Sequence, residues 1–214
     1  MDYKSLKEGW KRYPRKWDNQ NWKYSYRRSL GSGIWNDPNS YIKEKIDFLN
    51  HWKCRVDRNT AIPDLIEYSK NLNNLLEGVS SFKLLNINHK NLEFTRKIYK
   101  LLSKVNGLGP TGISKYMHMH KPELFMMWDA QIIRDYFHIK TVLKTTATPK
   151  RYLKFMLQMK HEILEAIDTF SKYKNINKKQ AIIEFKKCFN NETLPRILDK
   201  YNYVTRGEYK RPIY

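Results

Sequence analysis

Cysteine is scarce in this sequence, which has two among its 214 residues, Cys54 and Cys188. They lie far apart and within helical patterns, so neither a disulfide framework nor a cysteine-based metal knuckle is predicted. Long apolar runs are missing as well. No stretch approaches the roughly 20 apolar residues of a membrane-spanning helix, and the N-terminus lacks the apolar core of a signal peptide. We therefore expect an intracellular protein with no membrane partner.

Acidic residues are few compared with basic ones. The sequence has 21 Asp and Glu against 41 Lys and Arg, which gives a formal net charge of +20. Such an excess repels itself in a compact fold, and an acidic polymer would neutralise it. The charge therefore favours nucleic acid as the partner. The alternative is a protein that is basic throughout because its composition is rich in lysine and asparagine, with no nucleic-acid partner.

β-Strand patterns are missing too, because no segment alternates apolar and polar residues between hairpin turns. Even the most β-prone segment, 141–148, is interpreted as a loop. Apolar residues instead recur at helical spacing, which predicts an all-α fold, either one domain or two lobes that share a cleft. The expected helices run from Ser40 to Trp52, Pro63 to Leu76, 91 to 105, Thr111 onward, Ala130 to Phe137, Pro149 to Lys172, Lys178 to Phe189 and Leu194 to Tyr201.

The chain divides by composition into a basic, aromatic arm (residues 1–40), a helical domain (41–205) and a basic tail (206–214). The first thirty residues hold nine Lys or Arg and three acids, interleaved with tryptophans and tyrosines. Such rings can stack on unpaired bases while the charges follow the phosphates, as in single-strand binding. In the other interpretation the rings pack onto the helical body and the lysines stay solvated.

The segment from Val105 to Asp129 is the one around which the chain is organised. It ends one helical pattern, makes a turn, and starts the next helix near Thr111. Two glycines around one apolar residue give the turn its conformational freedom. The turn consists of Asn106, Gly107, Leu108, Gly109 and Pro110.

This turn has the features of a phosphate-binding hairpin. Leu108 is expected to point inward and hold the two helices together, and Pro110 suits the first position of the second helix. The amides from Leu108 to Gly112 would then face outward at the positive end of that helix, where they form a cradle for one phosphate.

The residues VNGLGPTGISK resemble the hairpin of the helix-hairpin-helix DNA glycosylase superfamily, whose pattern is L-P-G-V-G-x-x-x-A. In that family a catalytic aspartate lies at the start of the next helix. Asp129 follows Gly109 by twenty residues, the family's spacing, and precedes AQIIRDYF, which has helical spacing. The resemblance implies that Asp129 is catalytic and that the fold has two lobes with a cleft between them. The residues it assigns to DNA binding are Asn106, Gly107, Leu108, Gly109, Pro110, Thr111, Gly112 and Lys115.

Asp129 suits this chemistry because cleavage of an N-glycosidic bond builds positive charge on the sugar. A nearby carboxylate can stabilise that charge and orient or deprotonate a water molecule. Aspartate is also a preferred helix N-cap, so a purely structural role is the alternative. In the superfamily one residue performs both tasks.

The sequence departs from the family pattern at Asn106, which replaces a proline, and at Ile113, which replaces a small residue. Thr111 stands where members with lyase activity have their nucleophilic lysine. Lys115 lies one turn further on the same helix face, where it could attack the sugar or contact a phosphate. The iron–sulfur cluster of some members needs four cysteines, which this chain does not have.

Three further side chains invite a functional interpretation. His118 and His120 suggest a metal, but a separation of two places them on different helix faces and no ligand set completes them, so no metal site is predicted. Trp128 either stacks on an extruded base in a base pocket or packs in the core.

The resemblance implies a DNA repair glycosylase that flips a damaged or mismatched base from the duplex and hydrolyses its N-glycosidic bond, acting as a monomer without strong lyase activity. It implies no cofactor except a monovalent cation on the hairpin carbonyls. Two other functions stay open. One is a non-catalytic helix-hairpin-helix DNA-binding protein, and the other is an RNA- or single-strand-binding protein that uses the aromatic arm.

Overall fold

The computed structural model of the protein describes residues 1–14 and 38–206, and its regular structure is entirely helical there. Residues 141–148 form a loop, as predicted, and the described ranges contain no strand. The all-α prediction is confirmed. The elements are α1 (Tyr3–Arg12), α3 (Pro38–His51), α4 (Arg58–Glu77), the 3-10 turn η2 (Leu84–Asn86), α5 (His89–Leu102), α6 (Pro110–His120), α7 (Ala130–Phe137), α8 (Pro149–Lys174), α9 (Lys178–Cys188) and α10 (Leu194–Thr205).

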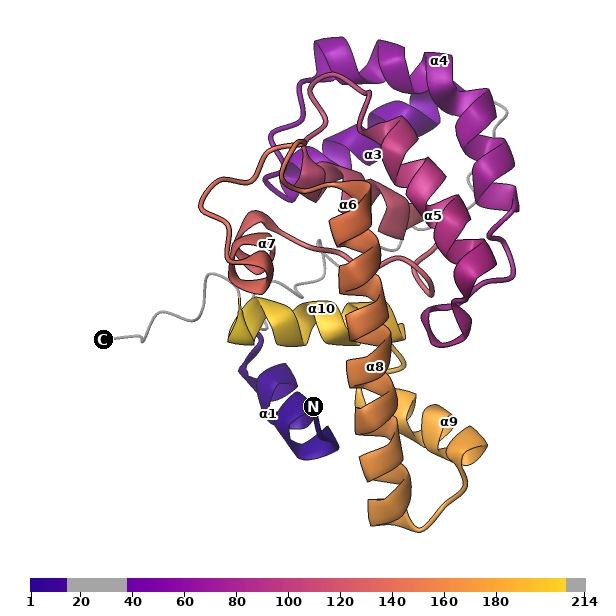
Figure 1. Cartoon of the computed structure of the whole chain (residues 1–214), viewed down its shortest axis with the longest axis vertical. Helices are drawn as coiled ribbons and strands as arrows, with labels where there is room; N and C mark the ends of the chain where they lie inside the picture. The colour runs from indigo at the N-terminus through magenta and orange to yellow at the C-terminus, as the bar shows by residue number, and fades with distance from the viewer. Residues whose placement is uncertain (15–37, 207–214) are drawn as a thin grey trace.

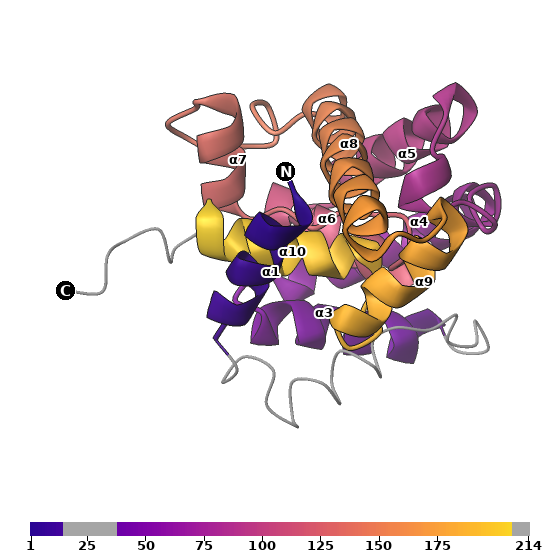
Figure 2. The ribbon, with the colours of Figure 1, turned by 90° about the horizontal axis from the view of Figure 1, so that it is seen from below.

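The 26-residue helix α8 is the longest element and runs along most of the molecule (Figure 1). Helices α3, α4, α5 and α6 gather around one end of it, while α1, α9 and α10 pack around the other half (Figure 1). Helix α10 crosses between α1 and the α3/α6 pair, as both views show (Figures 1 and 2). No helix among the described residues is long and apolar enough to span a membrane.

The core follows the helical periodicity of the sequence. The face predicted for α8 is fully buried along its whole length, and its methionines fill the core. Burial of this face against α5, α9 and α10 makes α8 the central support of the fold. The face consists of Tyr152, Phe155, Met156, Met159, Ile163, Ile167 and Phe170.

Helix starts are set by capping side chains. The predicted cap Asn177 accepts a hydrogen bond from the Gln180 amide at 2.9 Å, and Thr148 caps α8 with Pro149 at its first position. The start expected at Pro63 for the second predicted helix is wrong, because this helix, α4, begins at Arg58. Asp57 caps it through the Asn59 amide, at 3.0 Å, so the first turn is satisfied before the proline is reached.

Part of the N-terminal arm packs onto the helical body. Leu6 of α1 is fully buried, and the Trp10 ring meets Phe189 edge-on with the centroids 5.3 Å apart. A side chain on Gly9 would collide with the Tyr201 ring, 2.5 Å away, so glycine lets α1 lie close against α10. Four further aromatic residues of the arm lie outside the described residues, namely Trp17, Trp22, Tyr24 and Tyr26. Positions 207–214 of the tail lie outside them as well.

Candidate functional site

Gly107 is required by the packing of the turn between α5 and α6. Its φ of 72° lies in the left-handed region that glycine favours. A Cβ there would lie 2.6 Å from Thr60 Oγ1 and 2.9 Å from Asp57 Cβ. The Gly107 carbonyl also accepts from the Asp57 amide at 3.3 Å. The turn is therefore docked tightly against the start of α4.

Gly109 has a different role, because its φ of −79° suits any residue. A Cβ built on Gly109 meets no atom within 4 Å, so neither conformation nor packing inside the protein requires glycine here. Gly112, by contrast, gives room to Leu108, whose Cδ1 would lie 2.7 Å from an added Cβ. Leu108 is fully buried, as predicted.

The amides at the start of α6 are available to a ligand. Among the described residues, no carbonyl or side chain accepts from the amides of Gly109, Thr111 and Gly112. The Asn106 amide, in contrast, donates to Asp64 Oδ2 at 2.7 Å and is already used. The unsatisfied amides and the positive end of α6 make this place suitable for an anion.

Two carbonyls at this turn already accept hydrogen bonds from other parts of the chain. The Val105 carbonyl accepts a hydrogen bond from the ammonium group of Lys144, and the Gly107 carbonyl accepts from the Asp57 amide. Both oxygens thus have donors from the chain itself. The positive charge beside the turn belongs to Lys144, whose pKa is lowered by burial while Asp64 opposes that shift.

One carboxylate oxygen of Asp129 accepts a hydrogen bond within the described part of the protein, and the other does not. Its Oδ1 accepts from the Ile132 amide at 2.8 Å and so caps α7, as predicted. No hydrogen-bond donor among the described residues reaches its Oδ2. The side chain is half-buried. Capping and chemistry can therefore coexist in Asp129.

The position of Asp129 relative to α6 is fixed by Ser114. The Ser114 hydroxyl lies 3.1 Å from the Trp128 carbonyl and accepts from the Trp128 amide at 3.2 Å. These contacts are buried, and they tie the middle of α6 to the residue before Asp129. The helix that begins with the free amides is thus joined by buried hydrogen bonds to the residue that precedes Asp129.

Trp128 belongs to the core. Its side chain is fully buried, with the ring 5.0 Å from that of Tyr152 and 5.6 Å from that of Phe155, between centroids. Tyr99 meets it edge-on at 6.0 Å. A ring enclosed in this way presents no face to an extruded base. Of the two roles left open by the sequence, the structure shows the core role.

Lys115 takes part in a charged cluster that the sequence did not reveal. Its Nζ lies 5.0 Å from the centre of the Trp52 ring, and the Arg196 guanidinium lies 5.6 Å from the same ring. Arg196 in turn forms an ion pair with Asp199, one turn along α10. The indole of Trp52 thus brings cations from α6 and α10 together.

Asp129 is close enough to this cluster to affect its titration. Burial raises the pKa of the Asp199 carboxyl group, a shift that Arg196 and Lys115 oppose and Asp129 supports. Burial also raises the pKa of the Cys54 thiol, with smaller contributions from Lys115 and Asp129.

The turn before α4 holds this cluster in place. Lys53 and Arg55 both have left-handed backbones, with φ of 56° and 52°. The Asn50 side chain accepts from the Val56 amide at 2.6 Å and donates to its carbonyl at 2.9 Å. The apolar periodicity predicted a helix up to Trp52 but did not predict this turn, because the contacts of the turn follow no repeating spacing.

The two histidines are structural. His118 is fully buried with Nδ1 2.8 Å from the Phe125 carbonyl, and burial lowers its pKa to about 3. Burial also lowers the pKa of His120, whose ring lies against Tyr116. In the described part of the chain, no group of three or more His, Cys, Asp or Glu side chains could hold a metal ion.

The site combines an anion cradle, a carboxylate with a free oxygen and an ammonium group. Such a set suits a reaction that develops positive charge beside a bound phosphate. No family model, no curated protein and no solved structure matches this chain.

Proposed function

We propose that the protein is a monomeric DNA glycosylase of the helix-hairpin-helix type, which hydrolyses the N-glycosidic bond of a damaged or mismatched base. One observation carries this proposal. The free oxygen of Asp129 is fixed relative to the amide-rich start of α6 through the bonds between Ser114 and Trp128. A glycosylase needs this combination of a held phosphate and a nearby carboxylate.

The chemistry follows from these parts. The amides of Gly109, Thr111 and Gly112 hold a phosphate beside the target nucleotide. The base leaves the duplex and enters between two lobes, one around α3–α6 and one around α8–α10. As the bond to the base breaks, the Asp129 carboxylate stabilises the positive sugar and orients a water molecule toward it.

Hydrolysis is favoured over lyase chemistry. Thr111 offers a hydroxyl group where lyase members carry an amine, so it cannot form a Schiff base. The Lys115 ammonium lies over the Trp52 ring and within the field of Asp199, where it supports phosphate binding. The ammonium group of Lys144 replaces the monovalent cation that the resemblance implies on the hairpin carbonyls.

The test is a set of duplexes, each with one damaged or mismatched base, incubated with the protein and then heated in alkali. Alkali cleaves the strand at every abasic site, so a glycosylase produces a cut at the lesion. A cut before the alkali step would show lyase activity and contradict the hydrolytic mechanism. Tight binding to the duplexes with no cut on any of them would favour the non-catalytic DNA-binding protein instead.

A further inference from the structure

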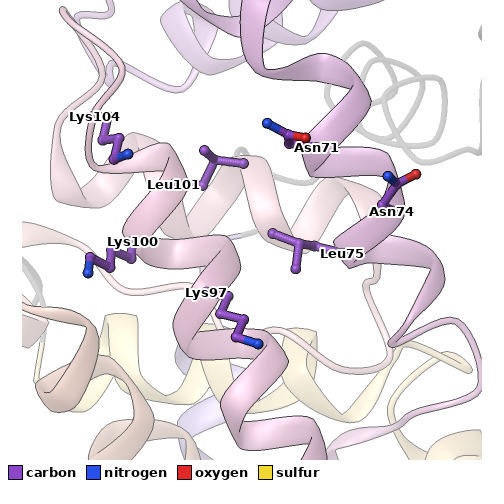
Figure 3. Close-up of a pocket in the computed structure, with 7 residues that line it drawn as sticks. All are labelled: Asn71, Asn74, Leu75, Lys97, Lys100, Leu101 and Lys104. Atoms are coloured by element: carbon purple, nitrogen blue, oxygen red, sulfur yellow. The ribbon is translucent and has the colours of Figure 1, made fainter.

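A groove lies between α4 and α5 (Figure 3), and neither Asp129 nor any residue of the charged cluster lines it. Its volume is about 460 Å³. Leu75 and Leu101 form an apolar floor between the two helices, with lysines along the α5 side and asparagines along the α4 side (Figure 3). The lining residues are Asn71, Asn74, Leu75, Lys97, Lys100, Leu101 and Lys104.

The lysines form a row along one face of α5. Lys97, Lys100 and Lys104 are spaced by three and four residues, so they follow each other along the helix (Figure 3). At a rise of about 1.5 Å per residue the row extends over roughly 10 Å. It ends two residues before Asn106, at the turn that leads into α6.

Most of the positive charge of this groove has no acidic partner among the described residues. No carboxylate lines the groove. Lys97 lies 4.0 Å from Glu93, but Glu93 is engaged by Arg96 through two hydrogen bonds of 2.8 and 2.7 Å. Within the described ranges, no acidic side chain forms an ion pair with Lys100 or Lys104. An anionic occupant would supply the missing charge.

The shape of the row indicates which kind of anion fits. A pocket for a single phosphate would draw its cations together around one point, whereas these three follow one another along α5 (Figure 3). A row of exposed lysines suits phosphates that repeat along a strand, and apolar side chains suit the sugars between them. The carboxamides of Asn71 and Asn74 offer donors and acceptors on the other side.

We propose that the α4/α5 groove binds one strand of DNA and continues the path of the phosphate backbone away from the turn at Asn106. The choice of DNA as the ligand rests on the proposed function. The residues that would contact it belong to a separate surface, the α4/α5 groove. Lys97, Lys100 and Lys104 each neutralise a phosphate, and the groove lengthens the footprint without touching the target base.

The experiment compares two triple variants that lose the same charge. The first is Lys97→Gln with Lys100→Gln and Lys104→Gln. The matched control is Lys172→Gln with Lys174→Gln and Lys179→Gln, three exposed lysines around the α8–α9 turn, at the far end of the molecule (Figure 1). Binding of a fluorescent duplex is measured over a range of salt concentrations, and both variants are checked by thermal melting.

Each neutralised phosphate contributes about 0.9 to the slope of log affinity against log salt concentration. The groove variant should therefore lose about 2 to 3 from the slope and bind more weakly, with its melting temperature unchanged. The control should keep nearly the wild-type slope, with only a small decrease because its net positive charge, and so its long-range electrostatic attraction to DNA, is lower.

Equal slope losses in both variants, or none in the groove variant, would overturn the groove as a strand-binding site while leaving DNA binding intact. Displacement of the strand by a mononucleotide at similar concentration would assign the groove to a small anion instead. Absence of duplex binding by the wild-type protein would reject the proposed function and this inference together.

Discussion

The indole Nε1 of Trp128 donates a hydrogen bond to the carbonyl oxygen of Pro110, 3.2 Å away. Pro110 is the first residue of α6, and Trp128 precedes the cap of α7. The same tryptophan exchanges hydrogen bonds with Ser114 through its backbone. One buried residue therefore joins the start of α6 to the start of α7, and it places Asp129 without contacting a ligand itself.

Ser114→Ala should destabilise the fold more than a comparable substitution elsewhere. It leaves the buried Trp128 amide and carbonyl without their hydroxyl partner, which costs about 1–3 kcal/mol. Ser69→Ala is the control, because that hydroxyl makes an exposed hydrogen bond to the Ile66 carbonyl within α4, at 2.7 Å. Urea unfolding measures both variants. Equal stability losses would mean that the Ser114 bridge contributes little.

The two glycines of the turn should respond differently to alanine. Gly107→Ala forces a positive φ on alanine and a clash with Thr60, so we expect a stability loss of roughly 1–3 kcal/mol. Gly109→Ala should leave stability unchanged, because its Cβ enters open space. If phosphate approaches there, the methyl group should lower DNA affinity. Thermal melting and DNA titration separate these effects, and a Gly109→Ala variant with full affinity would place the phosphate elsewhere.

Asp129→Asn tests the catalytic role. The amide keeps the size and much of the cap of α7, so stability should fall by no more than about 1 kcal/mol. Base release should fall by two or more orders of magnitude, because an amide neither stabilises a positive sugar nor takes a proton from water. Asp2→Asn is the control, since Asp2 caps α1 in the same way through the Ser5 amide, at 2.7 Å. An undiminished rate for Asp129→Asn would move the chemistry to another residue.

Because of Lys144, DNA binding at the turn should not depend on which inorganic cation is in the buffer. Duplex binding by the wild-type protein is expected to be the same in sodium, potassium and choline chloride at equal ionic strength, because an ammonium group already occupies the Val105 carbonyl. Lys144→Met should lower stability by about 1–3 kcal/mol through loss of this charged hydrogen bond. A clear preference of the wild type for potassium or sodium would contradict this assignment.

His118 should make the fold sensitive to acid. Its pKa is about 3 in the folded protein and 6.5 ordinarily. Between these two values the imidazole is protonated in the unfolded chain and neutral in the folded one. The free energy of unfolding should therefore be highest above pH 6.5 and fall as the pH drops toward 3. Urea titrations from pH 7 to about 4 measure the slope. His118→Asn should be less stable at pH 7 but show a shallower decline, and an equal decline would assign the effect to other groups.

The helices could be predicted from the sequence because their determinants are local. Apolar spacing located the buried face of α8, and caps such as Asn177 act within three residues along the chain. The same local signals located Leu108 in the core and Asp129 as the cap of α7. Pro63 misled the prediction because a stronger local signal, the Asp57 cap, begins α4 earlier.

Long-range contacts were decided only by the tertiary structure. The sequence could not show that Gly107 is held by α4 whereas Gly109 faces open space, since the two glycines look alike in a motif. Lys144 reaches Val105 across 39 residues, and Trp52 meets cations from α6 and α10. These contacts depend on which helices pack together. Apolar periodicity predicts which face of each helix is buried. It does not predict which other helix packs against that face, because this depends on the fold of the whole chain.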